Sequence, residues 1–310
     1  MPAVHLPQDH TTLPTYPLLA GDLEEGGYDG IWVGEVNDID AVTAATLIAT
    51  GTAGAAIGLL LNTFTRAPTT LAMTAATLGH LAPGRIKVVL GVASPLLVSR
   101  WNGIAYERPA ARLRDTLRFV RAALDGGRVS GDFSTFASGG FTLPDPPAEP
   151  PLLLIAACGP RALQLASDEA DGVVLNWVAP GDLEKVHPLP TSRDAVSAVF
   201  PVCPSADPAV VDATMRPVLA DYLAAPAYAE QQRRLGRGEA LQPMWEAWAA
   251  GDRRSAHAQL PTSVIDELVV SGDPAACRQQ LRDIEAMYGI RAIAAYFDLP
   301  GLSYRDAVLA

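Results

Sequence analysis

Short apolar runs, several of them β-branched, alternate with longer runs rich in alanine and leucine along the whole chain. The short runs are bounded by turn residues, which is typical of strands, while the longer runs fit helices. Eight strands are predicted, over 3–7, 30–35, 54–62, 85–92, 152–157, 172–177, 197–202 and 291–297. They are apolar without alternation, and this pattern indicates a parallel sheet that is covered on both faces.

The runs between these strands carry the start and stop signals of helices. Asp40 is a predicted N-cap for a helix over 41–50, and Pro68 opens a helix that ends before Pro83. Strands that alternate with helices through 310 residues predict an α/β fold, a (β/α)8 TIM barrel, as a single domain over 1–310. The alternative is an open doubly wound sheet, but that fold would require a Gly-rich turn after the first strand.

Two segments interrupt the alternation. Residues 128–150 predict a short hairpin followed by a proline-rich connector. Residues 204–262 predict a helical excursion before the last strand. The predicted barrel therefore carries a hairpin insertion and a helical insertion.

Composition narrows the class of protein. With 49% hydrophobic and 18% charged residues the chain is globular, and its net charge of −11 argues against nucleic acid or an anionic membrane as partner. Three widely spaced cysteines fit a reducing compartment. The sequence shows neither an export signal nor a membrane-spanning run, so we expect a soluble, cytoplasmic protein whose partner is a small molecule.

The common catalytic and phosphate-binding motifs are missing from the sequence. It contains no G-x-G-x-x-G loop, no G-x-x-x-x-G-K-[ST] loop and no G-x-S-x-G nucleophile elbow. The five histidines form no common metal-binding motif, so no metal is expected.

Polar residues do follow the predicted strands, at the positions where α/β barrels hold their sites. They are Glu35 at the second strand, Asn62 to Arg66 at the third, Ala93 and Ser94 at the fourth, Cys158, Gly159 and Arg161 at the fifth, and Asn176 and Trp177 at the sixth. Each also has a structural interpretation, since Glu35 could cap a helix, Arg66 could pair with a carboxylate and Trp177 could be core. Their shared position favours a site.

Several segments resemble the bacterial luciferase-like superfamily, in the deazaflavin branch that includes methylenetetrahydromethanopterin reductase. They are YDGIWVGE (28–35), NTFTRAP (62–68), LGVASP (90–95), ACGPRAL (157–163), ADGVVLNW (170–177), VFPVCPSADP (199–208), PAYAEQQRRLG (226–236) and VSGDPAACRQQL (270–281). Each segment alone is moderately specific, but together they cover nearly the whole chain in order.

The resemblance implies a barrel mouth that binds a deazaflavin, coenzyme F420, or alternatively FMN. It implies a non-prolyl cis peptide in a bulge of the third strand, at about Leu59-Leu60, and a phosphate contact at Cys158, Gly159 and Arg161. Gly159-Pro160 also opens a predicted helix, whose free N–H groups and dipole favour an anion. The implied cofactor-binding residues are Leu59, Leu60, Asn62, Arg66, Ala93, Ser94, Cys158, Gly159, Arg161, Asn176 and Trp177.

The chain also departs from the family pattern. Glu35-Val36 stands where many relatives carry Asp-His, Leu96 stands in place of an acidic residue, and Ala67 in place of a histidine. The acid–base groups and substrates of those relatives therefore do not carry over.

The leading expectation is an F420-dependent oxidoreductase that moves a hydride between the cofactor and a small organic substrate. Glu35 would give or take a proton, and Trp177 and Trp245 would form apolar walls. The alternatives are an FMN-dependent monooxygenase of the same superfamily and a non-catalytic luciferase-like subunit. A homodimer is left open.

Overall fold

The strands of the computed structural model form a parallel barrel. The structure describes residues 2–7, 13–190, 195–297 and 302–309. Hydrogen-bonded strands follow the order β10-β9-β11-β1-β2-β3-β4-β7-β8, and β8 also pairs with β9, which closes the ring. The predicted TIM barrel is thus confirmed. Its strands are β1 (Ala3–His5), β2 (Gly30–Gly34), β3 (Ala56–Asn62), β4 (Ile86–Gly91), β7 (Leu152–Ala156), β8 (Gly172–Asn176), β9 (Val196–Cys203) and β11 (Arg291–Tyr296), with the short β10 (Val270–Ser271) added beside β9.

The chain divides into two compact units. The N-terminal unit holds residues 8–157 and 161–174, and the C-terminal unit holds 1–7, 158–160 and 175–310. In the N-terminal unit β2, β3, β4 and β7 are consecutive parallel neighbours. Its helices are α1 (Tyr16–Glu25), α2 (Ala41–Gly51), α3 (Pro68–Leu81), α4 (Pro109–Leu124) and α5 (Pro160–Glu169, of which Pro160 belongs to the other unit), with a 3-10 helix at Leu13–Thr15 and a π-helix at Leu96–Trp101.

The predicted helix starts are confirmed in this unit. Asp40 caps α2, because its Oδ1 accepts a hydrogen bond of 2.8 Å from the Thr43 amide. Proline occupies the first position of both α3 and α4, where its missing N–H leaves no bond unmade.

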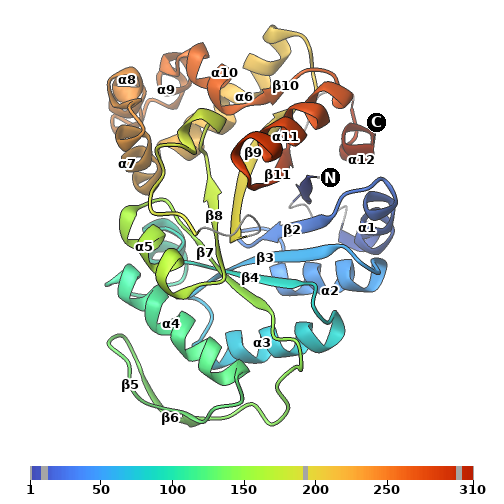
Figure 1. The fold of residues 1–310 in the computed structure, drawn as a ribbon. Helices are drawn as coiled ribbons and strands as arrows, with labels where there is room; N and C mark the ends of the chain where they lie inside the picture. The colour runs from blue at the N-terminus through green and yellow to red at the C-terminus, as the bar shows by residue number, and fades with distance from the viewer. Residues whose placement is uncertain (1, 8–12, 191–194, 298–301, 310) are drawn as a thin grey trace. The chain divides into compact units, whose positions relative to one another are not determined.

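The predicted hairpin is also present, as the antiparallel pair β5 (Val129–Asp132) and β6 (Ala137–Phe141) beside α4 (Figure 1). Asp115 on α4 anchors its turn, since Asp115 Oδ2 accepts bonds from Ser134 Oγ at 2.7 Å and from the Thr135 amide at 2.9 Å. The ring of Phe119 lies 5.9 Å from that of Phe136 and 5.7 Å from that of Phe141, measured between centroids. Polar anchoring and aromatic packing together fix the hairpin on the helix.

In the C-terminal unit, β1, β11 and β9 are parallel neighbours, and helices fill the predicted excursion (Figure 1). A cluster of buried apolar side chains joins these helices to one another. Asp273 caps the helix at Pro274–Tyr288, with a bond of 2.8 Å from the Ala276 amide. The helices are α6 (Pro208–Leu223), α7 (Pro226–Arg234), α8 (Gly238–Ala249), α9 (Arg253–Gln259), α10 (Thr262–Leu268), α11 (Pro274–Tyr288) and α12 (Tyr304–Leu309), with a short turn at Pro180–Asp182.

No helix within the described residues has both the length and the apolar character needed to cross a membrane. The expectation of a single domain over 1–310 stays a prediction.

We expect Glu24→Gln to lower the free energy of unfolding by about 1–3 kcal/mol at neutral pH. Glu24 accepts backbone bonds from Ala53 at 2.9 Å, Gly54 at 2.6 Å and Ala55 at 2.5 Å, and so holds the loop before β3. Burial alone would raise the pKa of Glu24, but these bonds and the charge of Arg85 bring it below its ordinary value of 4.5.

The sign of the pH effect follows from that shift. Because the pKa of Glu24 is lower in the folded chain, its stabilisation is present above the unfolded-state pKa and is lost as the pH falls through the folded-state value. Urea unfolding at pH 7 and at acid pH measures the difference, with the exposed neighbour Glu25→Gln as control. An equal effect of both variants at pH 7 would refute the role of Glu24.

Candidate functional site

Four of the expected site residues follow three adjacent strands of the N-terminal unit. Glu35 comes directly after β2, Asn62 ends β3, and Ala93 and Ser94 come after β4. β2 pairs with β3 up to Gly34, and β3 pairs with β4 up to Asn62, all in parallel. Because the carboxyl ends of parallel strands meet at one edge of a sheet, these residues share that edge.

Glu35 is held by Arg66 in a two-point ion pair. Arg66 Nε donates to Glu35 Oε2 at 3.0 Å, and Arg66 Nη2 donates to Glu35 Oε1 at 2.7 Å. Arg66 Nη2 also contacts Asp40 Oδ2. The Arg66 side chain is 17% exposed and that of Glu35 is 23% exposed, so the pair is shielded but reachable. The sequence leaves open whether Arg66 contacts a ligand or pairs with a carboxylate. In the structure, Arg66 pairs with the carboxylates of Glu35 and Asp40.

These contacts shift the pKa values of Arg66 and Asp40. The hydrogen bonds that Arg66 donates to Glu35 raise the pKa of Arg66 despite burial. Burial alone would raise the pKa of Asp40, but bonds from Thr43 and the charge of Arg66 lower it. The cluster is therefore one guanidinium clamped between two carboxylates.

Asn62 presents a buried donor at the same edge. Its Oδ1 accepts from the Phe64 amide at 2.9 Å, whereas Nδ2 is buried and has no hydrogen-bond partner among the described residues. An unsatisfied buried donor costs about 1–3 kcal/mol, so this amide nitrogen can donate to a bound group. Ala93, which follows the neighbouring strand β4, adopts a left-handed φ of 52°, a conformation that costs energy for a residue with a Cβ.

The third strand carries a correction. The structure contains no cis peptide at Leu59-Leu60, since the one cis bond among the described residues precedes Pro188. β3 runs there as a regular strand, with Leu59 opposite Val88 and Leu60 opposite Val89. Leu59 is wholly buried, so only the partly exposed Leu60 offers side-chain surface.

In the C-terminal unit, helix α7 holds the end of β8. Gln231 Nε2 donates to the Asn176 carbonyl at 2.9 Å, and Gln232 Nε2 donates to the Trp177 carbonyl at 2.7 Å. Trp177 has a left-handed φ of 57°, and its ring packs 4.3 Å from that of Tyr222 between centroids. Two side-chain amides therefore support a strained backbone at this strand end.

Cys158 lies beside Tyr228 and Arg234 of the same helix. Arg234 Nη2 donates to the Cys158 carbonyl at 2.5 Å. Burial raises the pKa of the Cys158 thiol to about 12, although Arg234 and Tyr228 oppose the shift. The thiol is therefore neutral at physiological pH and is not a nucleophile. Burial likewise raises the pKa of Tyr228.

Gly159 and Arg161 leave room at the start of α5. A Cβ placed on Gly159 would have only the Arg234 guanidinium within 4 Å, at 3.7 Å. Arg161 is exposed, and neither a hydrogen bond nor an ion pair engages it among the described residues. The two acidic residues of the same helix bind other side chains, because Asp168 accepts from Gln164 at 2.7 Å and Glu169 accepts from Arg118 at 2.6 Å.

Sequence reasoning assigns no role to Tyr228, Gln231, Gln232 or Arg234, although they lie in the segment 226–236 that carries part of the family resemblance. It also expects Trp245 at the substrate. Trp245 instead belongs to the apolar cluster of the helices, 8% exposed, with Nε1 donating to the Leu223 carbonyl at 2.9 Å. Trp177 lies in the same cluster with the same 8% exposure, so both side chains pack in its interior, and the expectation that they form substrate walls stays a prediction.

Comparisons with known proteins show what the whole chain is similar to. A Mycobacterium tuberculosis protein named as a candidate coenzyme F420-dependent oxidoreductase is 25% identical over 90% of this chain and 88% of its own. The 5,10-methylenetetrahydromethanopterin reductase of Archaeoglobus fulgidus is 29% identical over 52% of this chain and 48% of its own. The structure of the F420-dependent tetrahydromethanopterin reductase of Methanopyrus kandleri superposes with a TM-score of 0.77 at 20% identity, covering 99% of this chain and 95% of that one.

The family model described as luciferase-like monooxygenase matches residues 7–290. Since that match spans most of the chain, and the barrel has the fold of the reductase above, the protein belongs to the luciferase-like family.

Proposed function

We propose that this protein is an F420-dependent oxidoreductase that transfers a hydride between the deazaflavin and a small organic substrate. The observation that carries the proposal is the open start of α5, where Gly159 leaves space and Arg161 has no partner among the residues that the structure describes. The cofactor is supported by relatives that are named F420-dependent.

The residues present fit such a group. An anionic phosphate would suit the free backbone N–H groups at the start of α5, and Arg161 would add a charge-assisted bond. The unpaired Nδ2 of Asn62 would donate to a ring that carries carbonyl acceptors. Leu60, Arg66, Ala93, Ser94, Cys158, Asn176 and Trp177 complete the proposed cofactor-binding set.

When bound, the deazaflavin supplies the carbon that gives or accepts the hydride. The chain's own residues then orient the reactants and handle the proton. We assign that proton to Glu35, whose carboxylate is partly exposed at the end of β2. Arg66 fixes the orientation of this carboxylate through its two bonds.

We expect Arg161→Ala to weaken F420 binding about tenfold to a hundredfold, because a charge-assisted bond of roughly 1.5–3 kcal/mol is lost. Gly159→Val should weaken it further by closing the space beside Arg234. Fluorescence titration of the purified protein with F420 measures both affinities. Gln164→Ala, which changes a different residue of α5, is the control and should bind as the unaltered chain does.

The same titration decides between the proposed cofactor and its alternatives. The superfamily also contains monooxygenases, and the EDTA monooxygenase of Chelativorans sp. BNC1 superposes with a TM-score of 0.67 at 16% identity. Tight FMN binding with oxygen consumption would replace our proposal by a monooxygenase. Binding of neither cofactor would favour a non-catalytic subunit, and unchanged F420 affinity in both variants would remove the anchor at α5.

A further inference from the structure

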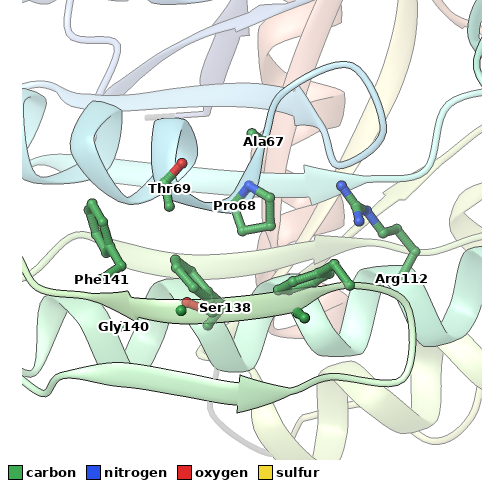
Figure 2. Close-up of a pocket in the computed structure, with 11 residues that line it drawn as sticks. Ala67, Pro68, Thr69, Arg112, Ser138, Gly140 and Phe141 are labelled. Carbon is green, nitrogen blue, oxygen red and sulfur yellow. The ribbon is translucent and has the colours of Figure 1, made fainter.

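A cavity of about 440 Å³ lies in the N-terminal unit between the start of α3, helix α4 and strand β6, and we call it the hairpin pocket. Figure 2 shows Pro68 and Thr69 on one side, Ser138 and Phe141 on the other, and Arg112 at one end. Its volume is in the range of about 300–1,000 Å³ that is typical of small-molecule sites. None of the residues that line it is acidic.

Arg112 is the cation of this pocket, and it differs from the other arginines of α4. Arg114 pairs with Asp115 at 3.2 Å, Arg118 with Glu169 at 2.6 Å, and Arg121 with Asp171 at 3.0 Å. Arg112 makes no ion pair with any described residue. Its Nε donates to the Thr63 carbonyl at 2.9 Å, which leaves both Nη groups without a hydrogen-bond partner in the described part of the chain.

The surroundings of this guanidinium are aromatic. Its central carbon lies 5.0 Å from the ring centroid of Phe136 and 5.9 Å from that of Phe64. Burial lowers the pKa of Arg112, and the carboxylate of Asp115 opposes the shift only through its charge. A cation that has lost part of its hydration and has no bonded anion is one that an incoming anion stabilises.

The walls of the pocket suit a flat apolar group. Phe136, Phe141 and Pro68 line it, and so does Gly139, where an added Cβ would meet nothing within 4 Å. Helix α3 starts at the same place with an N-cap, Ala67, that offers no side-chain acceptor. Its dipole adds to the attraction for negative charge.

We propose that the hairpin pocket binds a planar aromatic monocarboxylate, with the carboxylate on the Nη groups of Arg112 and the ring between Phe136, Phe141 and Pro68. The planar fork of a guanidinium matches two carboxylate oxygens. A single cation balances a single negative charge, so a phosphate dianion or a polyanion fits less well. The proposal does not depend on the cofactor proposed above.

Benzoate is the probe, and isothermal titration calorimetry measures its binding to the full chain. We expect saturable binding, with benzamide and acetate each bound at least tenfold more weakly, because one lacks the charge and the other lacks the ring. Arg112→Gln should weaken benzoate binding about tenfold to a hundredfold. Arg118→Gln removes the same charge from the same helix outside the pocket, and it should leave benzoate affinity unchanged.

Gly139→Leu tests the pocket independently of the arginine. The added side chain has free space and Gly139 lacks a positive φ, so the fold should survive while the cavity fills. Loss of benzoate binding in a variant with unchanged thermal unfolding supports the proposal. No saturable binding, equal binding of benzamide, equal binding by both arginine variants, or a Gly139→Leu effect on oligomeric state in place of benzoate binding would overturn it.

Discussion

Arg237→Ala is expected to lower the free energy of unfolding by about 3–5 kcal/mol, because it leaves a buried carboxylate without its buried cation. Arg237 Nη1 donates to Asp182 Oδ2 at 2.8 Å, and the two side chains are 9% and 1% exposed. The same guanidinium bonds Glu267 Oε2 at 2.7 Å and Gln232 Oε1 at 3.0 Å. Its loss would therefore open a network that ties α7, α10 and the turn at Pro180–Asp182 together.

Catalytic activity should also fall in this variant, because Gln232, which accepts a bond from Arg237, in turn donates to the Trp177 carbonyl. Chemical denaturation monitored by tryptophan fluorescence measures the free energy. Lys185→Ala is the matched control, since Lys185 reaches the other oxygen of Asp182 at 3.5 Å from a 60% exposed position. Exposed pairs contribute about 0–1 kcal/mol, so a Lys185→Ala effect as large as that of Arg237→Ala would contradict the importance of burial.

Most of the barrel could be predicted from the sequence because its strands are buried on both faces. Val33 and Leu61, for example, lie in continuous apolar runs and are 1% and 0% exposed. Local signals sufficed for helix starts as well, since the Asp40 cap bonds a residue only three positions away. Periodicity and capping are local, and local patterns are readable in one chain.

The site was less predictable because its bonds join distant segments. Gln232 supports Trp177 from 55 positions away, and Arg234 reaches Cys158 across 76 positions. No spacing pattern in the sequence predicts either contact. The cis peptide implied at Leu59-Leu60 came from the family resemblance, and the regular pairing of β3 with β4 shows that the resemblance does not extend to this detail.

Arg66 illustrates the boundary between the two kinds of information. Its type and position after the third strand pointed to a polar cluster, but the sequence left open whether it contacts a ligand or a carboxylate. The structure places Glu35, 31 positions earlier, on two of its nitrogens. The same contact now shapes what Glu35 can do, because a carboxylate held at both oxygens has a fixed direction.

Under the proposed function, Glu35→Gln should lower kcat about 10²- to 10⁴-fold, the range that a positioned proton donor or acceptor contributes. Glutamine keeps the shape and one acceptor for Arg66 but cannot exchange a proton. The assay follows oxidation of reduced F420 by the best acceptor in a panel of small aldehydes, ketones and quinones. F420 affinity, measured in parallel, should change little, because the variant alters the proton step and leaves the anchor at α5 intact.

Asp40→Asn separates the proton role from the ion-pair role. Asp40 is the second carboxylate on Arg66, and asparagine caps a helix about as well as aspartate, so α2 should persist while Arg66 loses one charge partner. If Glu35 only orients Arg66, both substitutions should lower kcat by similar, small factors. If Glu35 handles the proton, Asp40→Asn should stay within a few-fold of the unaltered chain while Glu35→Gln loses at least a hundredfold, and equal losses would assign the carboxylate to positioning alone.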